Sequence, residues 1–247
     1  MTVAWSDLGG ALIAGGIWLA IIACVLAVLV WDARRRRVAS ITLEVTGAVA
    51  RVWVAVVILG AVLGFIGLFT APTITLTEFP VGAGWPTPLP CDGPGGPASA
   101  APTLYCARIL TATAEVAGLG AGIKTLIFIG GLLAYATAAT PGVLVAVLSG
   151  RAGNGRPFDR SSSRWLLGSA LVILVAGMLS EVLLAIARFL AAGAVLPDGA
   201  SGAAITAAPT FQMVLPVWPI GASLALAALA VVFRYGSRLQ RDTEGLV

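Results

Sequence analysis

Long apolar runs separated by short polar segments dominate this chain. Five of them approach or exceed the roughly 20 residues with which a helix crosses a bilayer core about 30 Å thick. They cover residues 10–31, 52–70, 116–149, 165–190 and 214–233. The pattern predicts an all-α integral membrane protein with a five-helix transmembrane bundle, in which an N-terminal anchor helix accompanies a four-helix core.

The N-terminal run is interpreted as a retained anchor. Residues 1–9 carry no basic residue, and the arginines at 34–37 follow the apolar run instead of preceding it. A cleaved signal peptide has the opposite order. The alternative is a four-span protein in which this first segment is peripheral.

The third run is longer than a bilayer requires. Its Gly-rich first part, TAEVAGLGAGIK at residues 113–124, is interpreted as a helical lead-in above the membrane. The span itself is then expected at about 125–148. Pro141 lies inside this span and predicts a kink, because proline cannot donate a backbone hydrogen bond.

In chain order the prediction comprises four parts. Residues 1–37 form the anchor and its basic stop, and residues 38–70 form the second span. Residues 71–115 form an extracytoplasmic Pro/Gly-rich loop region with a cysteine pair. Residues 116–247 form a three-span core with a cytoplasmic loop at 150–164 and a basic C-terminal tail.

Two outer segments are expected to contain short β-strands. TITLTEF at 73–79 alternates with the period of a strand, and AITAAPTFQMVLPV at 204–217 is also extended and β-prone. We expect the two segments to pair into a small sheet that caps the helices. Prolines limit the length of each strand, and they are Pro72, Pro80, Pro209 and Pro216.

The basic residues fall almost entirely on one side of the predicted bundle. Of the 15 lysines and arginines, 12 lie within residues 34–51, 151–164 or 234–241. Basic residues mark the cytoplasmic side of a membrane protein. The expected orientation therefore places the N-terminus outside and the C-terminus in the cytoplasm.

The composition argues against an enzyme. The chain has no histidine, which removes the commonest general base and any Ser-His triad. Paired catalytic carboxylates are missing as well. Three cysteines, Cys24, Cys91 and Cys106, are too few and too scattered for a zinc or iron–sulfur cage. We therefore expect no catalytic residue, no cofactor and no metal.

Cys91 and Cys106 both fall in the predicted outer loop. A disulfide between them would stabilise this loop by roughly 3 kcal/mol in the chain-entropy model. The favoured interpretation is a structural staple, and the alternative is a redox sensor or thiol-exchange pair. Cys24 lies inside the first span and is expected to serve as a small apolar residue.

Three charged residues lie within the predicted spans or at their outer ends. Glu181 and Arg188 are two helical turns apart and so share one face of a helix, and Lys124 is a candidate partner for Glu181. The functional hypothesis is an ion or proton relay or a polar substrate site. The structural alternative is an ion pair near the outer interface, with Arg188 reaching the headgroups.

Two weaker spacings lie in the second span. Glu44 and Arg51 repeat the seven-residue separation at its inner edge, which favours an ordinary interfacial ion pair. Gly60 and Gly64 have the small-residue spacing that suits close contact between helices.

The segment RAGNGRPFDRSSSRW at 151–165 carries four arginines within 15 residues, between two apolar runs. Together with the C-terminal tail it places two arginine stripes at the cytoplasmic rim. They are expected to contact anionic lipid, or an acidic partner; direct nucleic-acid binding is not expected, since few aromatic residues interleave with them. The candidate docking set is Arg156, Pro157, Phe158, Asp159, Arg160, Arg238, Asp242 and Glu244.

The phrase GRPFDRSSSRW before an apolar span, and the ending VVFRYGSRLQRDTEGLV, resemble the bacterial multi-pass membrane family "domain of unknown function 2975". The resemblance rests on Gly155, Pro157 and Phe158 and on the tail from Phe233, and it covers about residues 115–247. It implies a bacterial inner-membrane protein. Some relatives are encoded beside a small helix-turn-helix regulator, which implies a cytoplasmic transcriptional regulator as partner.

The leading hypothesis is a non-enzymatic inner-membrane sensor or scaffold that docks a small cytoplasmic regulator. The alternative is a small transporter or channel that works through Glu181, Lys124 and Arg188. A membrane enzyme ranks third. The bilayer is an expected partner in each case, and a homo-oligomer is left open.

Overall fold

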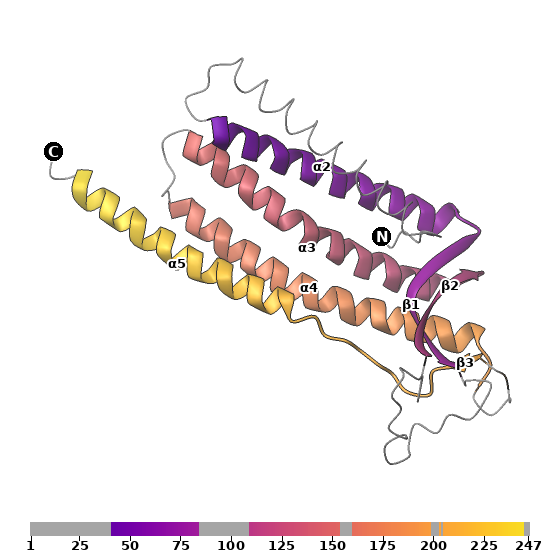
Figure 1. Cartoon of the computed structure of the whole chain (residues 1–247). Coiled ribbons are helices and arrows are strands. Elements are labelled where there is room, and N and C mark those ends of the chain that lie inside the picture. Colours follow the sequence, from indigo (N-terminus) through magenta and orange to yellow (C-terminus); the bar gives the residue numbers. More distant parts are fainter. Residues whose placement is uncertain (1–40, 84–108, 154–159, 199–202, 204, 245–247) are drawn as a thin grey trace, which may run out of the picture. The chain divides into compact units, whose positions relative to one another are not determined.

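A computed structural model describes residues 41–83, 109–153, 160–198, 203 and 205–244. Its elements follow one another along the chain as four helices and three strands within these residues (Figure 1). They are α2 (Ile41–Thr70), β1 (Thr73–Ala83), β2 (Ile109–Ala117), α3 (Ala121–Gly153), α4 (Arg160–Val195), β3 (Ile205–Ala207) and α5 (Trp218–Glu244). The expected anchor at residues 10–31 lies outside the described residues.

Four helices within the described residues are long and apolar enough to cross a membrane. They correspond to the second to fifth predicted spans, so four of the predicted helices are confirmed. The complete five-helix bundle stays a prediction. The helices also extend beyond the apolar runs. α2 begins at Ile41 rather than at residue 52, and α5 continues through the basic tail to Glu244.

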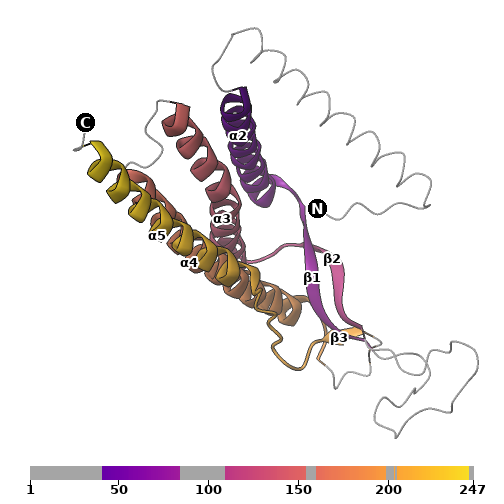
Figure 2. The ribbon, with the colours of Figure 1, turned by 60° about the vertical axis from the view of Figure 1, so that its left-hand side comes forward.

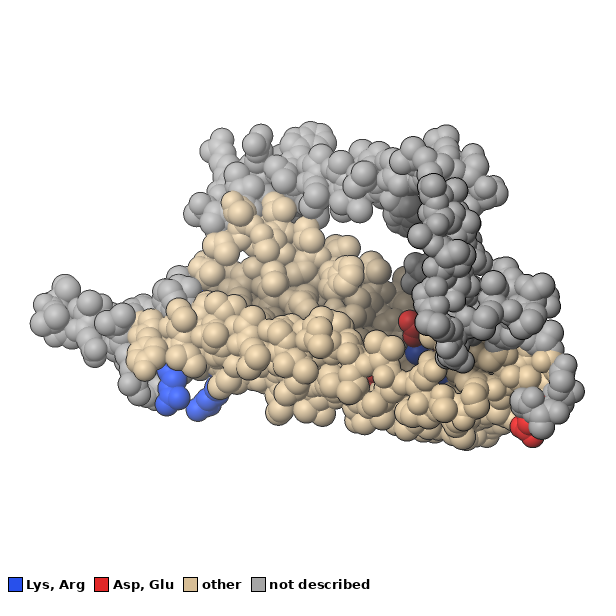
Figure 3. Space-filling view, turned by 60° about the horizontal axis from the view of Figure 1, so that its bottom comes forward, with Lys and Arg blue, Asp and Glu red and all other residues tan. Residues whose placement is uncertain are grey.

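Large apolar side chains point outward along these helices. Leu63, Leu171 and Leu224 are 59%, 63% and 65% exposed, respectively. Figure 3 shows that the described surface on one face of the molecule carries hardly any charged side chains. Soluble proteins rarely expose large contiguous apolar patches, so this surface is suited to lipid.

The chain divides into two compact units. The first unit comprises Met1–Ile58, Ala138–Leu171 and Ser223–Val247, and the second comprises Leu59–Thr137 and Val172–Ala222. Each of the four helices contributes one part to each unit. The second unit also contains all three strands.

The described part of the first unit is held together by contacts between helices. Leu144 of α3, Leu166 of α4 and Ala230 of α5 form one buried cluster. The indole N–H of Trp53 in α2 donates a hydrogen bond to the carbonyl of Ala138 in α3, at 3.0 Å. Gly142 lies at the same α2–α3 contact, where the two backbones come close.

The second unit contains a three-stranded antiparallel sheet in the order β2-β1-β3 (Figure 2). β1 includes the predicted strand at 73–79, and β3 comes from the second predicted segment. β3 pairs with the end of β1, with Val81 opposite Ala207 and Ala83 opposite Ile205. The expected pairing of the two outer segments is therefore confirmed.

The longest pairing of β1, however, is with a segment that the sequence interpretation assigned to a helix. Residues 113–117 belong to β2, and α3 begins only at Ala121. The predicted helical lead-in is therefore wrong for residues 113–120, and only residues 121–124 of it are helical. Ala112, Ala114 and Val116 share one face of β2, which packs on the core. Gly118 then adopts a φ of 71°, a left-handed conformation that ends the strand and that favours glycine.

A buried cluster joins the sheet to the helices of the second unit. Phe79 is 2% exposed, and it clusters with Leu76 and Val81 of β1 and with Ala191 and Ala192 of α4. Pro80 does not end β1 as expected. β3 pairs with β1 only from Val81 onward. At Pro80, β1 is therefore paired with β2 alone.

The predicted close contact at Gly60 and Gly64 is confirmed within the second unit. A Cβ added at Gly64 would lie 3.2 Å from the hydroxyl oxygen of Tyr135 in α3, and one at Gly60 would lie 3.6 Å from its ring. The two glycines thus leave room for the Tyr135 side chain against α2.

We predict that Gly142→Ala destabilises the protein. The new Cβ would lie 2.7 Å from Trp53 Cδ1 and 2.9 Å from Val54 Cγ2. Overpacking of this kind costs about 1–3 kcal/mol. At about 2–4 °C per kcal/mol for a chain of this size, we expect the Tm in detergent to fall by roughly 2–12 °C.

The matched control is Gly150→Ala in the same helix, where an added Cβ meets no atom within 4 Å. Its Tm should be unchanged or higher, because alanine is the better helix former. Equal losses of Tm in the two variants would contradict the prediction.

Candidate functional site

The candidate site begins at a bulge in β1. Between Leu76 and Phe79 the register of β1 against β2 shifts, so that β1 holds one extra residue. Glu78 lies in this bulge with a φ of 56°, and it is the one non-glycine residue with positive φ within the described residues. A left-handed conformation costs a residue with a side chain about 1–2 kcal/mol. Strain of this kind is often found at functional positions.

The strained residue carries an ion pair. Arg188 of α4 donates a hydrogen bond from Nη1 to Glu78 Oε2, at 2.8 Å. The Arg188 side chain is 20% exposed and that of Glu78 is 68% exposed. The sequence interpretation placed Arg188 near the outer interface but did not identify Glu78 as its partner.

Glu181 and Arg188 line one cavity of about 290 Å³, which confirms that they share a helix face. The cavity is also lined by Glu78, Thr111 of β2 and Gln212. Its remaining wall is apolar and consists of Pro80, Leu110, Ala185, Phe189 and Val214. Phe189 is held edge-on by Phe211, with ring centroids 5.5 Å apart. We call this the polar cavity.

Lys124 does not belong to the polar cavity. It lies in the first turn of α3, and it is not a lining residue. Within the described residues no ion pair joins it to Glu181, and none joins Glu44 to Arg51. The structure therefore brings together two of the three predicted intramembrane residues.

The structure describes the backbone of four of the eight residues in the docking set. Arg156, Pro157, Phe158 and Asp159 lie outside the described residues. Arg160 is the first residue of α4, and the described backbone of α5 includes Arg238, Asp242 and Glu244. Cys24, Cys91 and Cys106 also lie outside the described residues, so the disulfide stays a prediction.

The described ends of the two helices beside the arginine loop are tied together. Arg151 in the last turn of α3 donates a hydrogen bond from Nη1 to Ser162 Oγ in the first turn of α4, at 3.2 Å. Ser162 is fully buried. This bond gives Arg151 a structural role that its charge alone did not indicate.

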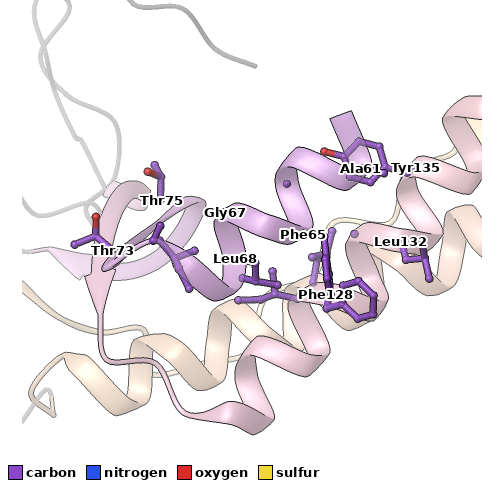
Figure 4. A pocket seen from close by; sticks show the side chains of 15 residues that line it. Ala61, Phe65, Gly67, Leu68, Thr73, Thr75, Phe128, Leu132 and Tyr135 are labelled. Carbon is purple, nitrogen blue, oxygen red and sulfur yellow. The ribbon is translucent and has the colours of Figure 1, made fainter. Parts of the chain in front are cut away.

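A second, larger cavity of about 490 Å³ lies in the second unit between α2, α3 and the start of β1 (Figure 4). None of its lining residues is charged. Phe65 and Phe128 form one wall, with ring centroids 4.7 Å apart, and glycines 64, 67 and 131 form other parts of the lining. We call this the apolar groove. Sequence reasoning missed it, although the glycines of α2 were a partial signal.

No group of three or more cysteine or acidic side chains within the described residues is arranged to hold a metal ion. Comparison of the chain with protein-family models, with curated proteins and with solved structures finds no match. The resemblance to the family "domain of unknown function 2975" stays a prediction. The function must therefore be argued from the site itself.

Two substitutions at Glu78 separate the contribution of the ion pair to stability from the cost of the left-handed backbone conformation. We predict that Glu78→Gln lowers stability by less than about 1 kcal/mol, because exposed ion pairs contribute little. Glu78→Gly loses the same carboxylate but also relieves the left-handed strain, and should be about 1 kcal/mol more stable than Glu78→Gln.

Thermal unfolding in detergent measures both effects. Thr77→Gly is the control, because Thr77 has no positive φ and glycine there should only destabilise the strand. If Glu78→Gly is less stable than Glu78→Gln, the bulge does not store strain.

Proposed function

We propose that the protein is a non-enzymatic sensor or scaffold of the bacterial inner membrane that docks a small cytoplasmic transcriptional regulator. One observation carries this proposal. α4 is a single continuous helix of 36 residues whose two ends are each fixed by a side-chain contact. Ser162 near its start accepts a hydrogen bond from Arg151, and Arg188 near its end is paired with Glu78 of the sheet.

A helix of this kind suits signal transfer. It exceeds the roughly 20 residues that cross a bilayer, so an outer event at the sheet and an inner event at the arginine loop act on the same helix. Because a ligand shifts an equilibrium only when it binds two states differently, the sensing state must change the Glu78–Arg188 contact or its surroundings.

The chemistry of the docking set supports a specific kind of partner. Arg156, Arg160 and Arg238 favour an acidic surface, and Phe158 would fill an apolar pocket. In the proposed orientation, with the N-terminus outside and the C-terminus in the cytoplasm, these residues are on the cytoplasmic side. The excess of basic residues there supports this orientation.

The test is co-purification of the tagged full chain from detergent-solubilised membranes of its own cells. The expected result is a small DNA-binding regulator that is retained by the wild type and lost with the double variant Arg160→Glu, Arg238→Glu. Charge reversal at contacts of this type typically costs several kcal/mol of binding free energy. A transient complex weakened by this amount should dissociate during washing.

Arg51→Glu is the matched control. Arg51 is an exposed basic residue of α2 that is not in the docking set, so this variant should retain the regulator. If the wild type retains none, or if Arg51→Glu loses it as completely as the double variant, the docking hypothesis fails.

A small transporter or channel is a second candidate, and it is favoured by the presence of Glu181 and Arg188 in one cavity. A carboxylate within a membrane span is costly, so its presence there favours a functional role. Glu181→Gln is then expected to abolish ion flux into liposomes, measured with an ion-sensitive dye, and Lys124→Gln, outside the cavity, should preserve it. Absence of flux through the wild type would eliminate this candidate.

A further inference from the structure

The apolar groove has the features of a binding site for a lipid chain. Its lining residues carry no charge, and the hydroxyl groups among them are confined to Thr73, Thr75 and Tyr135. Figure 4 shows Thr73 and Thr75 at one end of the groove and Tyr135 with Ala61 at the other. Ligand sites of this kind are mostly apolar, with a few polar groups that orient the ligand.

The groove also matches the bilayer in length. It extends along α2 from Ala61 to the end of the helix at Thr70, which is about 14 Å at 1.5 Å per residue. One leaflet of a hydrocarbon core is about half of 30 Å. The threonine end coincides with the point where the chain leaves the helix and becomes strand β1. Strands with an open edge do not lie in lipid, so this end is at the bilayer surface.

The hollow depends on two lining positions, Gly67 and Gly131, that have no side chain. A Cβ added at Gly67 or Gly131 would meet no atom within 4 Å. The wall opposite is preformed, because Phe65 packs against both Phe69 and Phe128, at 5.0 and 4.7 Å between ring centroids. The space is therefore not filled by neighbouring described side chains.

We propose that the apolar groove binds one acyl chain of a bilayer phospholipid, with the polar end of the lipid at Thr73 and Thr75. A phospholipid is favoured over a water-soluble amphiphile because the groove lies in helices that have the length and composition of membrane spans. It is favoured over a charged ligand because no charged side chain lines the groove.

The experiment uses the full chain in phosphatidylcholine vesicles with a trace of phosphatidylcholine that carries a photoactivatable diazirine in one acyl chain. Labelled residues are mapped by mass spectrometry. Phe65 and Phe128 should be labelled more strongly than Leu63, which lies on the same helix as Phe65, is 59% exposed and does not line the groove. Leu63 therefore reports contact with bulk lipid.

Two variants fill the hollow without a clash of the new Cβ. Gly131→Leu and Gly67→Leu should each lower the labelling of Phe128 by about tenfold, which corresponds to about 1.4 kcal/mol. Gly150→Leu, in α3 but outside the groove, should leave labelling unchanged. Because the two filling variants lie on different helices, a folding defect in one leaves the other as a test.

Three results would overturn the proposal. Equal labelling of Leu63 and Phe128 would mean that Phe128 contacts bulk lipid only. Labelling that a free diazirine fatty acid gives and the phospholipid does not would assign the groove to a soluble amphiphile. A direct cross-link from a photoreactive residue at position 132 to residues 10–31 would assign it to the chain's own first apolar segment. The docking test is independent of all three.

Discussion

Burial of Phe79 is the constraint on which the second unit depends. In strict alternation, Ile74 and Leu76 would share their face of β1 with Glu78 and Pro80, and Phe79 would point to the opposite face. One extra residue in the bulge reverses this parity, so that Phe79 and Val81 join the core cluster and are 2% and 6% exposed. Burying a phenylalanine stabilises by about 1.5–3 kcal/mol, which offsets the cost of the left-handed conformation at Glu78.

The bulge also determines what the strand presents on its other face. With Phe79 turned to the core, the Glu78 carboxylate becomes available to Arg188, and the two line the polar cavity with Glu181. The ion pair contributes little energy, because Glu78 is largely exposed. Its importance is geometric, since it joins a fixed position of β1 to a fixed position of α4.

The sequence predicts the helices well and the site only in part. Apolar runs of about 20 residues have few alternatives to a membrane helix, and four of them are helical here. β2 was missed because its alternating Ala and Thr residues next to glycines resemble a small-residue helix, and its strand character depends on β1. Arg188 and Glu78 are 110 residues apart, so no spacing signals their contact. The apolar groove depends on the absence of side chains, which becomes visible only when two helices and a strand are placed together.

β1 connects the apolar groove with the polar cavity. Thr73, Ile74 and Thr75 line the apolar groove, and Glu78 and Pro80 line the polar cavity. Leu76 lies between these two sets of lining residues and is buried in the core cluster. The part of β1 that joins the two cavities is therefore a packed strand with a bulge and not a loop. Packed cores tend to be bistable and not continuously deformable. The bulge at Glu78 therefore lies between the residues of β1 that line the groove and the contact with Arg188, and a movement of β1 would have to pass through this strained residue to reach that contact.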